Sequence, residues 1–141
     1  MNSPVLSSRF DAALLILRIA IAMVFIYHGS AILFGAFGGP GPIGFAAYKH
    51  WPVIIGYLVG FAQFAGGLAV LTGVLHRIGT VCIMIVMLGA IFTVHISHGF
   101  SVANNGYEFA LTEFLLAFAL FLTGPGRYSM GVVLPESIRK L

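Results

Sequence analysis

Long apolar stretches alternate with short polar connections along this chain. Three of them, residues 12–34, 53–75 and 78–97, reach the roughly 20 residues that a helix needs to cross a hydrocarbon core. A fourth, residues 107–123, is long enough only if its polar start, Tyr107-Glu108, lies among the lipid headgroups. The pattern predicts an all-α integral membrane protein: a four-helix bundle formed as one domain by residues 1–141.

Composition supports a membrane location and narrows the chemistry. Charged residues make up 8% of the chain, against about 25% in ordinary globular domains. The first apolar stretch exceeds the 7–15 residues of a signal-peptide core, so we expect it to be retained as a span. Cys82 is the single cysteine, which excludes an internal disulfide or a CxxC redox pair.

Basic residues are distributed unevenly between the two sides that alternating helices define. One side has only Lys49, and the other carries Arg9, Arg77, Arg127, Arg139 and Lys140. Because positive charge favours cytoplasmic loops, both termini are predicted to be cytoplasmic. The net charge of +3 indicates contact with anionic lipid rather than with nucleic acid.

The longest connection, residues 35–52, is rich in glycine and proline and also carries aromatic residues. We expect it to lie in the membrane interface as an aromatic anchor; the alternative is a lid folded back over the bundle. Small residues at helical spacing predict close helix packing. They are Gly56, Gly60, Gly66, Gly67, Gly73 and Gly89.

Five ionisable side chains are expected at similar depth in the membrane. They are His28, His95, His98, Glu108 and Glu113. With the N-terminus inside, the first and third spans run outward and the fourth starts outside. A rise of about 1.5 Å per residue then places all five in the outer half of the bundle, although they come from three helices.

Some of these polar residues also have a structural interpretation. Glu108 follows Asn105 by three residues and predicts a capping box, and His98 suits the last turn of a helix. Glu113 and His28 lie inside apolar runs, where an ionisable group indicates function. Arg18 either extends to the inner headgroups or points inward, with Gln63 as its nearest partner.

Three ligand chemistries suit such residues. A metal ion is a weak alternative, with His28, His95, His98 and Glu113 as ligands, and an axially ligated haem is another. A quinone headgroup fits the residue types best, because its carbonyls need donors and its reduction needs protons. We assign His28 and His95 as hydrogen-bonding groups, Glu113 as a proton relay and Arg18 as a counter-charge.

Several motifs resemble the DoxX family over nearly the whole chain. They are Leu17-Arg18 with His28-Gly29-Ser30-Ala31-Ile32-Leu33-Phe34-Gly35, Gln63 with Gly66-Gly67, Gly73 to Arg77, Asn105-Gly106-Tyr107-Glu108, and Gly124-Pro125-Gly126-Arg127-Tyr128-Ser129-Met130-Gly131. The resemblance carries over Arg18, His28, Glu108 and Arg127 as candidate functional residues. Ile32, Gln63 and Gly131 depart from the family's usual lysine, glutamate and aspartate, which suggests an ion pair replaced by neutral residues.

The resemblance implies a four-helix protein of the bacterial inner membrane. It further implies a quinone-linked redox subunit that works with a soluble or membrane partner enzyme in sulfur, thiol or oxidative-stress metabolism. Any enzymatic role would be that of a quinone-dependent oxidoreductase subunit. The alternative is a non-catalytic scaffold or assembly factor for a redox complex. Arg127 and Tyr128 are either a flank that ends the last span or a docking patch for the partner, and homo-oligomerisation stays open.

Overall fold

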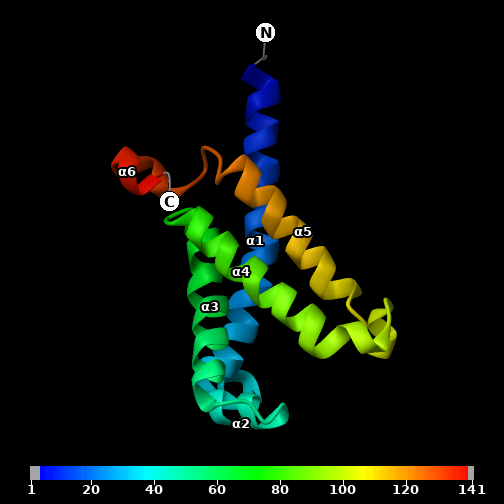
Figure 1. Ribbon diagram of the computed structural model, residues 1–141. Coiled ribbons are helices and arrows are strands. Elements are labelled where there is room, and N and C mark those ends of the chain that lie inside the picture. The colour runs from blue at the N-terminus through cyan, green and yellow to red at the C-terminus, as the bar shows by residue number, and fades with distance from the viewer. Residues whose placement is uncertain (1–3, 140–141) are drawn as a thin grey trace.

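The computed structural model describes residues 4–139, with side chains for residues 7–137. Every regular element in that range is a helix or a helical turn (Figure 1). The four longest are α1 (Pro4–Phe34), α3 (Val53–Thr72), α4 (His76–Ala90) and α5 (Glu108–Thr123). The shorter elements are η1 (Ala36–Gly38), α2 (Gly41–Tyr48), η2 (Ile91–His95), η3 (Ile96–His98), η4 (Val102–Asn104), η5 (Met130–Val133) and α6 (Glu136–Arg139).

Three helical stretches are long and apolar enough to cross a membrane. They are Ser7–Phe34, Val53–Thr72 and His76–His98. The predictions of an all-helical chain and of a multi-pass membrane protein are therefore confirmed. Helix α5 has 16 residues, fewer than the roughly 20 that span a bilayer core unaided. Helix α1 begins at Pro4, before the apolar run at residue 12, because the polar segment ahead of that run continues the helix.

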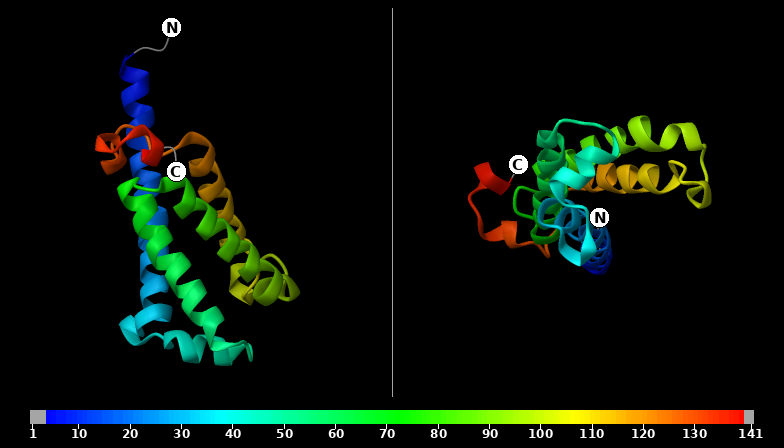
Figure 2. Two further views of the ribbon diagram at one scale, coloured as in Figure 1. Left: turned by 60° about the vertical axis from the view of Figure 1, so that its left-hand side comes forward. Right: turned by 90° about the horizontal axis from the view of Figure 1, so that it is seen from below.

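The long helices form two pairs joined at one end. Helix α1 packs along α3, α3 packs on α4, and α4 packs on α5. Figures 1 and 2 show the α4–α5 pair diverging from the α1–α3 pair as it leaves the short α3–α4 turn. That turn has a left-handed backbone at Gly73, where φ is 75°, and at Leu75, where φ is 52°.

The core lies where the two pairs meet. Helix α1 contributes residues spaced so that they share one face, as an amphipathic helix requires. The buried apolar residues are Leu14, Ile21 and Phe25 of α1, Val70 of α3, Ile83 and Met87 of α4 with Ile91 of η2, and Ala110, Ala117 and Leu120 of α5. Many other large apolar side chains are exposed, as expected where lipid replaces water around the fold.

The connection between the first two spans is ordered into η1 and α2. Helix α2 packs against both α1 and α3, and Ala46 is completely buried there. Phe37 and Tyr48 are exposed on this segment, whereas Phe45 and Trp51 are half-buried. The segment thus has exposed aromatic rings and a short helix that packs against the first two spans, and its position relative to a membrane stays a prediction.

The ends of the elements that carry most of the positive charge lie together. Arg9 lies near the start of α1, Arg77 near the start of α4, and Arg127 after α5, and these regions share one end of the fold (Figure 1). Lys49 follows α2 at the opposite end. Lys140 lies outside the described residues, and nothing is described of the side chain of Arg139.

Candidate ligand cavity between α3 and α4

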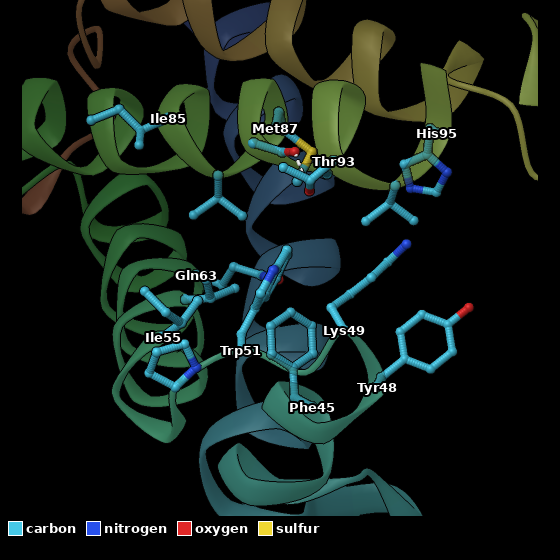
Figure 3. Close-up of a pocket in the computed structure, with 16 residues that line it drawn as sticks. Phe45, Tyr48, Lys49, Trp51, Ile55, Gln63, Ile85, Met87, Thr93 and His95 are labelled. Atoms are coloured by element: carbon cyan, nitrogen blue, oxygen red, sulfur yellow. Dashed lines mark hydrogen bonds between the residues drawn. The ribbon is translucent and has the colours of Figure 1, made fainter. Parts of the chain in front are cut away.

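A cavity of about 690 Å³ separates α2 and α3 from α4 and η2. We call it the α3–α4 cavity; Figure 3 shows side chains reaching into it from both walls. Its size and its mainly apolar lining are those of a typical small-molecule site. The polar side chains that line it are Lys49, Gln63, Thr93 and His95, and the aromatic ones are Phe45, Tyr48 and Trp51.

Gln63 is the buried polar group of this cavity. It lies on α3 with an exposed fraction of only 6%, and its amide has no hydrogen-bond partner among the described residues. Its amide atoms are not among the fully enclosed side-chain atoms that lack a hydrogen-bond partner in the described part of the chain, so they are open to the cavity that the side chain lines. The amide is therefore available to a ligand that can hydrogen-bond inside the cavity.

The opposite wall includes the π-helical turn η2, and such turns are frequent at functional sites. His95 ends this turn, and its Nδ1 lies 2.8 Å from the backbone carbonyl oxygen of Asn105. Because a carbonyl only accepts, Nδ1 carries the proton and donates it. In the neutral ring the lone pair of Nε2 is then left for another partner.

The hydroxyl proton of Thr93, on the same turn, is also used in a hydrogen bond within the protein. This hydroxyl donates to the backbone carbonyl of Gly89 at 2.7 Å (Figure 3). A hydroxyl has one proton, so the side chain of Thr93 can only accept from a further partner.

The wall formed by α2 combines aromatic rings with a cation. Lys49 directly follows α2, and its Nζ lies 5.5 Å from the centroid of the Tyr48 ring, within cation–π range. Its side chain extends toward the end of the cavity where His95 lies (Figure 3). The rings of Phe45 and Trp51 are 6.2 Å apart and inclined to each other, forming an apolar wall suited to a flat ligand.

Only two of the seven predicted polar-site candidates, Gln63 and His95, line the α3–α4 cavity. His28 is exposed on α1, where its ring meets that of Tyr27 edge-on with centroids 5.4 Å apart. Glu113 is buried on α5, and its Oε2 atom has no hydrogen-bond partner in the described part of the chain. Similar depth does not bring such residues together, because the two helix pairs diverge (Figure 2).

His98 and Glu108 serve local structure. His98 is exposed, and its Nδ1 donates to the carbonyl of Val94 at 2.9 Å. The carboxylate of Glu108 accepts the backbone N–H of Val102 at 2.9 Å, which ties the loop to the start of α5. The expected capping box with Asn105 is not formed, because no side chain caps this helix. Across the described residues, no group of three His, Cys, Asp or Glu side chains is placed to hold a metal ion.

Arg18 points inward but lies outside the cavity. With an exposed fraction of 1%, its guanidinium donates to four backbone carbonyls. They are Val70 at 2.8 Å, Leu71, Pro125 at 2.9 Å and Tyr128 at 2.7 Å. We call this arrangement the arginine clamp. The last carbonyls of a helix have no intrahelical partner, so Arg18 satisfies those at the end of α3 while holding the segment after α5.

Asp11, which the sequence reasoning missed, holds the same segment. Its Oδ1 accepts the backbone N–H of Arg127 at 3.0 Å, and its Oδ2 lies 4.0 Å from Nε of that residue. The side chain of Arg127 is 77% exposed, and that of Tyr128 is also exposed. The two predicted docking residues are therefore attached to α1 through their backbones and present their side chains outward.

His76 is a further residue that sequence reasoning missed. It is buried at the start of α4, where its Nε2 donates to the carbonyl of Leu120 at 3.2 Å. Its Nδ1 has no hydrogen-bond partner. A polar residue at a helix start is common, so its position beside a short connection gave no signal that it would be buried.

These features define a multi-pass helical membrane protein with a ligand-sized cavity between its helices. The model of the DoxX family matches residues 13–96, and the chain belongs to this family. The matched region runs from α1 to η2 and includes Arg18 and both walls of the cavity, whereas the segment 124–131 lies beyond it. Neither the curated proteins nor the solved structures compared with the chain gave a match.

The placement of Ile32 fits the suggested replacement of an ion pair. Ile32 is buried on α1, with Cγ2 3.1 Å from the position that a Cβ on Gly60 would take. Gly60 precedes Gln63 by about one turn of α3. Ile32 therefore meets α3 about one helical turn from Gln63.

Proposed function

We propose that this protein is a membrane subunit that binds a quinone or quinol in the α3–α4 cavity. In this role it exchanges electrons with a partner enzyme. The observation that carries the proposal is the position of Gln63: its amide has no hydrogen-bond partner among the described residues and is open to a cavity with aromatic residues in its lining. A quinone has a flat apolar ring for the aromatic residues and oxygen atoms for the amide.

Each polar group of the cavity has a role in this proposal. Gln63 hydrogen-bonds one ligand oxygen and fixes the orientation of the ring. His95, with Nδ1–H committed to Asn105, offers Nε2 as a proton acceptor. Lys49 supplies a positive charge. His28, Glu113 and Arg18 have no contact with the ligand in this proposal, because they do not line the cavity.

The proposal includes a membrane setting. Helix α5 serves as the fourth span, both termini face the cytoplasm, and the membrane is the bacterial inner membrane. The partner belongs to sulfur, thiol or oxidative-stress metabolism and exchanges electrons with the quinone at the cavity. The exposed side chains of Arg127 and Tyr128, at the end of the fold opposite Lys49, are a separate docking surface and not part of the electron path. The basic residues at that end of the fold support this orientation.

Replacing Gln63 by leucine is expected to weaken quinone binding by about tenfold, because one hydrogen bond inside an apolar site is lost. Trp51 is the single tryptophan of the chain and lines the cavity, so its fluorescence reports occupancy. The measurement is quenching of Trp51 by decylubiquinone with the protein in lipid nanodiscs. His28→Gln is the matched control, since it alters an exposed polar group outside the cavity.

Unchanged affinity in the Gln63→Leu variant, or no quenching of the wild-type protein, would refute this site. One observation favours a scaffold as the second candidate: the buried polar groups Arg18 and Asp11 hold the chain together and leave two outward side chains, Arg127 and Tyr128. A protein that copurifies with a soluble enzyme and carries no quinone would support that candidate.

A further inference from the structure

The η2 wall of the α3–α4 cavity presents hydrogen-bond acceptors to a ligand. Thr93 and His95 are the polar side chains that this turn contributes to the lining. The proton of Thr93 is committed to Gly89, and that of His95 Nδ1 to Asn105. With the imidazole ring of His95 neutral, what both side chains have left is lone pairs, on Oγ1 and on Nε2.

A ligand that satisfies this wall must therefore bring its own donors. A quinone has two carbonyl oxygens and no O–H group, so it cannot hydrogen-bond either acceptor. The corresponding hydroquinone has two O–H donors on the same ring. Gln63 on the facing wall does not discriminate, because its amide can both donate and accept.

The charge beside the cavity can contact either form of the ligand, because the ammonium group of Lys49 has N–H donors that a quinone carbonyl accepts as readily as a hydroquinone oxygen does. Lys49 is a cation in the lining, and its side chain extends toward the end where His95 lies (Figure 3). Like Gln63, it therefore does not discriminate between the two forms.

We propose that the α3–α4 cavity prefers the reduced hydroquinone over the oxidised quinone, with Thr93 and His95 as the residues that set this preference. The inference rests on the proposed function and specifies which redox form the same site favours. Two ordinary hydrogen bonds correspond to a preference of about tenfold or more in Kd. Preferential binding of the reduced form by tenfold raises the two-electron potential of the bound couple by about 30 mV.

The test is equilibrium dialysis of decylubiquinol and decylubiquinone, each with full-length protein in nanodiscs under anaerobic conditions, with Trp51 fluorescence as the reporter of occupancy. Thr93→Val and His95→Phe are each expected to reduce the ratio of the two Kd values about fivefold. They should do so by weakening quinol binding, with the Kd of the quinone within about twofold of its starting value. Thr93→Val removes only a hydroxyl from an exposed position, which keeps the test informative if His95→Phe does not fold.

Matched controls are available on neighbouring elements. Thr112 makes the same kind of bond to the carbonyl four residues earlier, and His98 is likewise bound through Nδ1 to a carbonyl, yet neither lines the cavity. Thr112→Val and His98→Phe should leave the ratio unchanged. Equal affinity for both forms, tighter quinone binding, or variants that weaken both forms alike would overturn the preference while leaving the quinone site in place. Failure of both forms to bind would overturn the proposed function together with it.

Discussion

The Arg18→Gln variant is expected to lose a large part of the stability of the folded protein. Arg18 supplies donors to four backbone carbonyls from two distant segments, and a glutamine amide has two N–H groups on a shorter side chain. Two carbonyls left without partners cost about 2–6 kcal/mol, a large part of the roughly 5–15 kcal/mol that stabilises a domain. Thermal unfolding in mild detergent, followed by size-exclusion chromatography, measures the loss.

Two further substitutions sharpen this prediction. Arg18→Lys keeps the charge but not the planar fork of donors, so its stability should lie between those of wild type and Arg18→Gln. Arg127→Gln changes an exposed side chain 4.0 Å from Asp11 and keeps the backbone N–H bond to that residue. We expect it to cost less than about 1 kcal/mol. If Arg18→Gln unfolds at the same temperature as Arg127→Gln, the arginine clamp does not stabilise the fold.

The arginine clamp shows which part of the fold the sequence could not supply. The apolar runs were enough to predict membrane-spanning helices, because length and hydropathy alone determine whether a helix can cross a bilayer. Because Arg18 lies among apolar residues, it was expected either to extend to the inner lipid headgroups or to point inward to a polar partner. The sequence did not decide between these two orientations. The actual partners of Arg18 are the backbone carbonyls of residues 70, 71, 125 and 128. Because every residue has a backbone carbonyl, the sequence could not show which ones Arg18 would bind.

The residues of the candidate site could be predicted only in part, because the sequence did not show how the helices are arranged. Gln63 and His95 were recognisable as polar residues within apolar segments, and both line the cavity. Depth along each span gave no information on how the α4–α5 pair diverges from the α1–α3 pair (Figure 2). For that reason His28 and Glu113 were expected to lie near Gln63 and His95. Lys49 and Thr93 were missed, the first because it follows a loop helix and the second because a threonine bound to its own helix is common.

The sequence also could not show which glycines lie in close contact with a neighbouring helix. Gly29 lies where α1 crosses α3: a Cβ there would overlap the backbone nitrogen of Phe64 and lie 2.7 Å from its Cα. Gly89 was predicted to pack closely, but apart from its own stretch of helix no described atom lies within 4 Å of the position a Cβ would take, and the residue lines the cavity. Both are glycines in apolar helices, and only the helix arrangement separates them.

The Gly29→Ala variant is therefore expected to be destabilised by about 2–3 kcal/mol, because the obstructing atoms belong to the backbone of α3 and the two helices must separate. Gly89→Ala is the matched control, and it should be neutral or gain up to about 1 kcal/mol, since alanine favours a helix more than glycine does. Thermal unfolding of both variants in the same detergent measures the difference. Gln63 directly precedes Phe64, so separation of α1 and α3 should also displace the cavity wall and weaken decylubiquinone binding in Gly29→Ala. Equal melting temperatures for the two variants would mean that α1 and α3 do not approach this closely in the membrane protein.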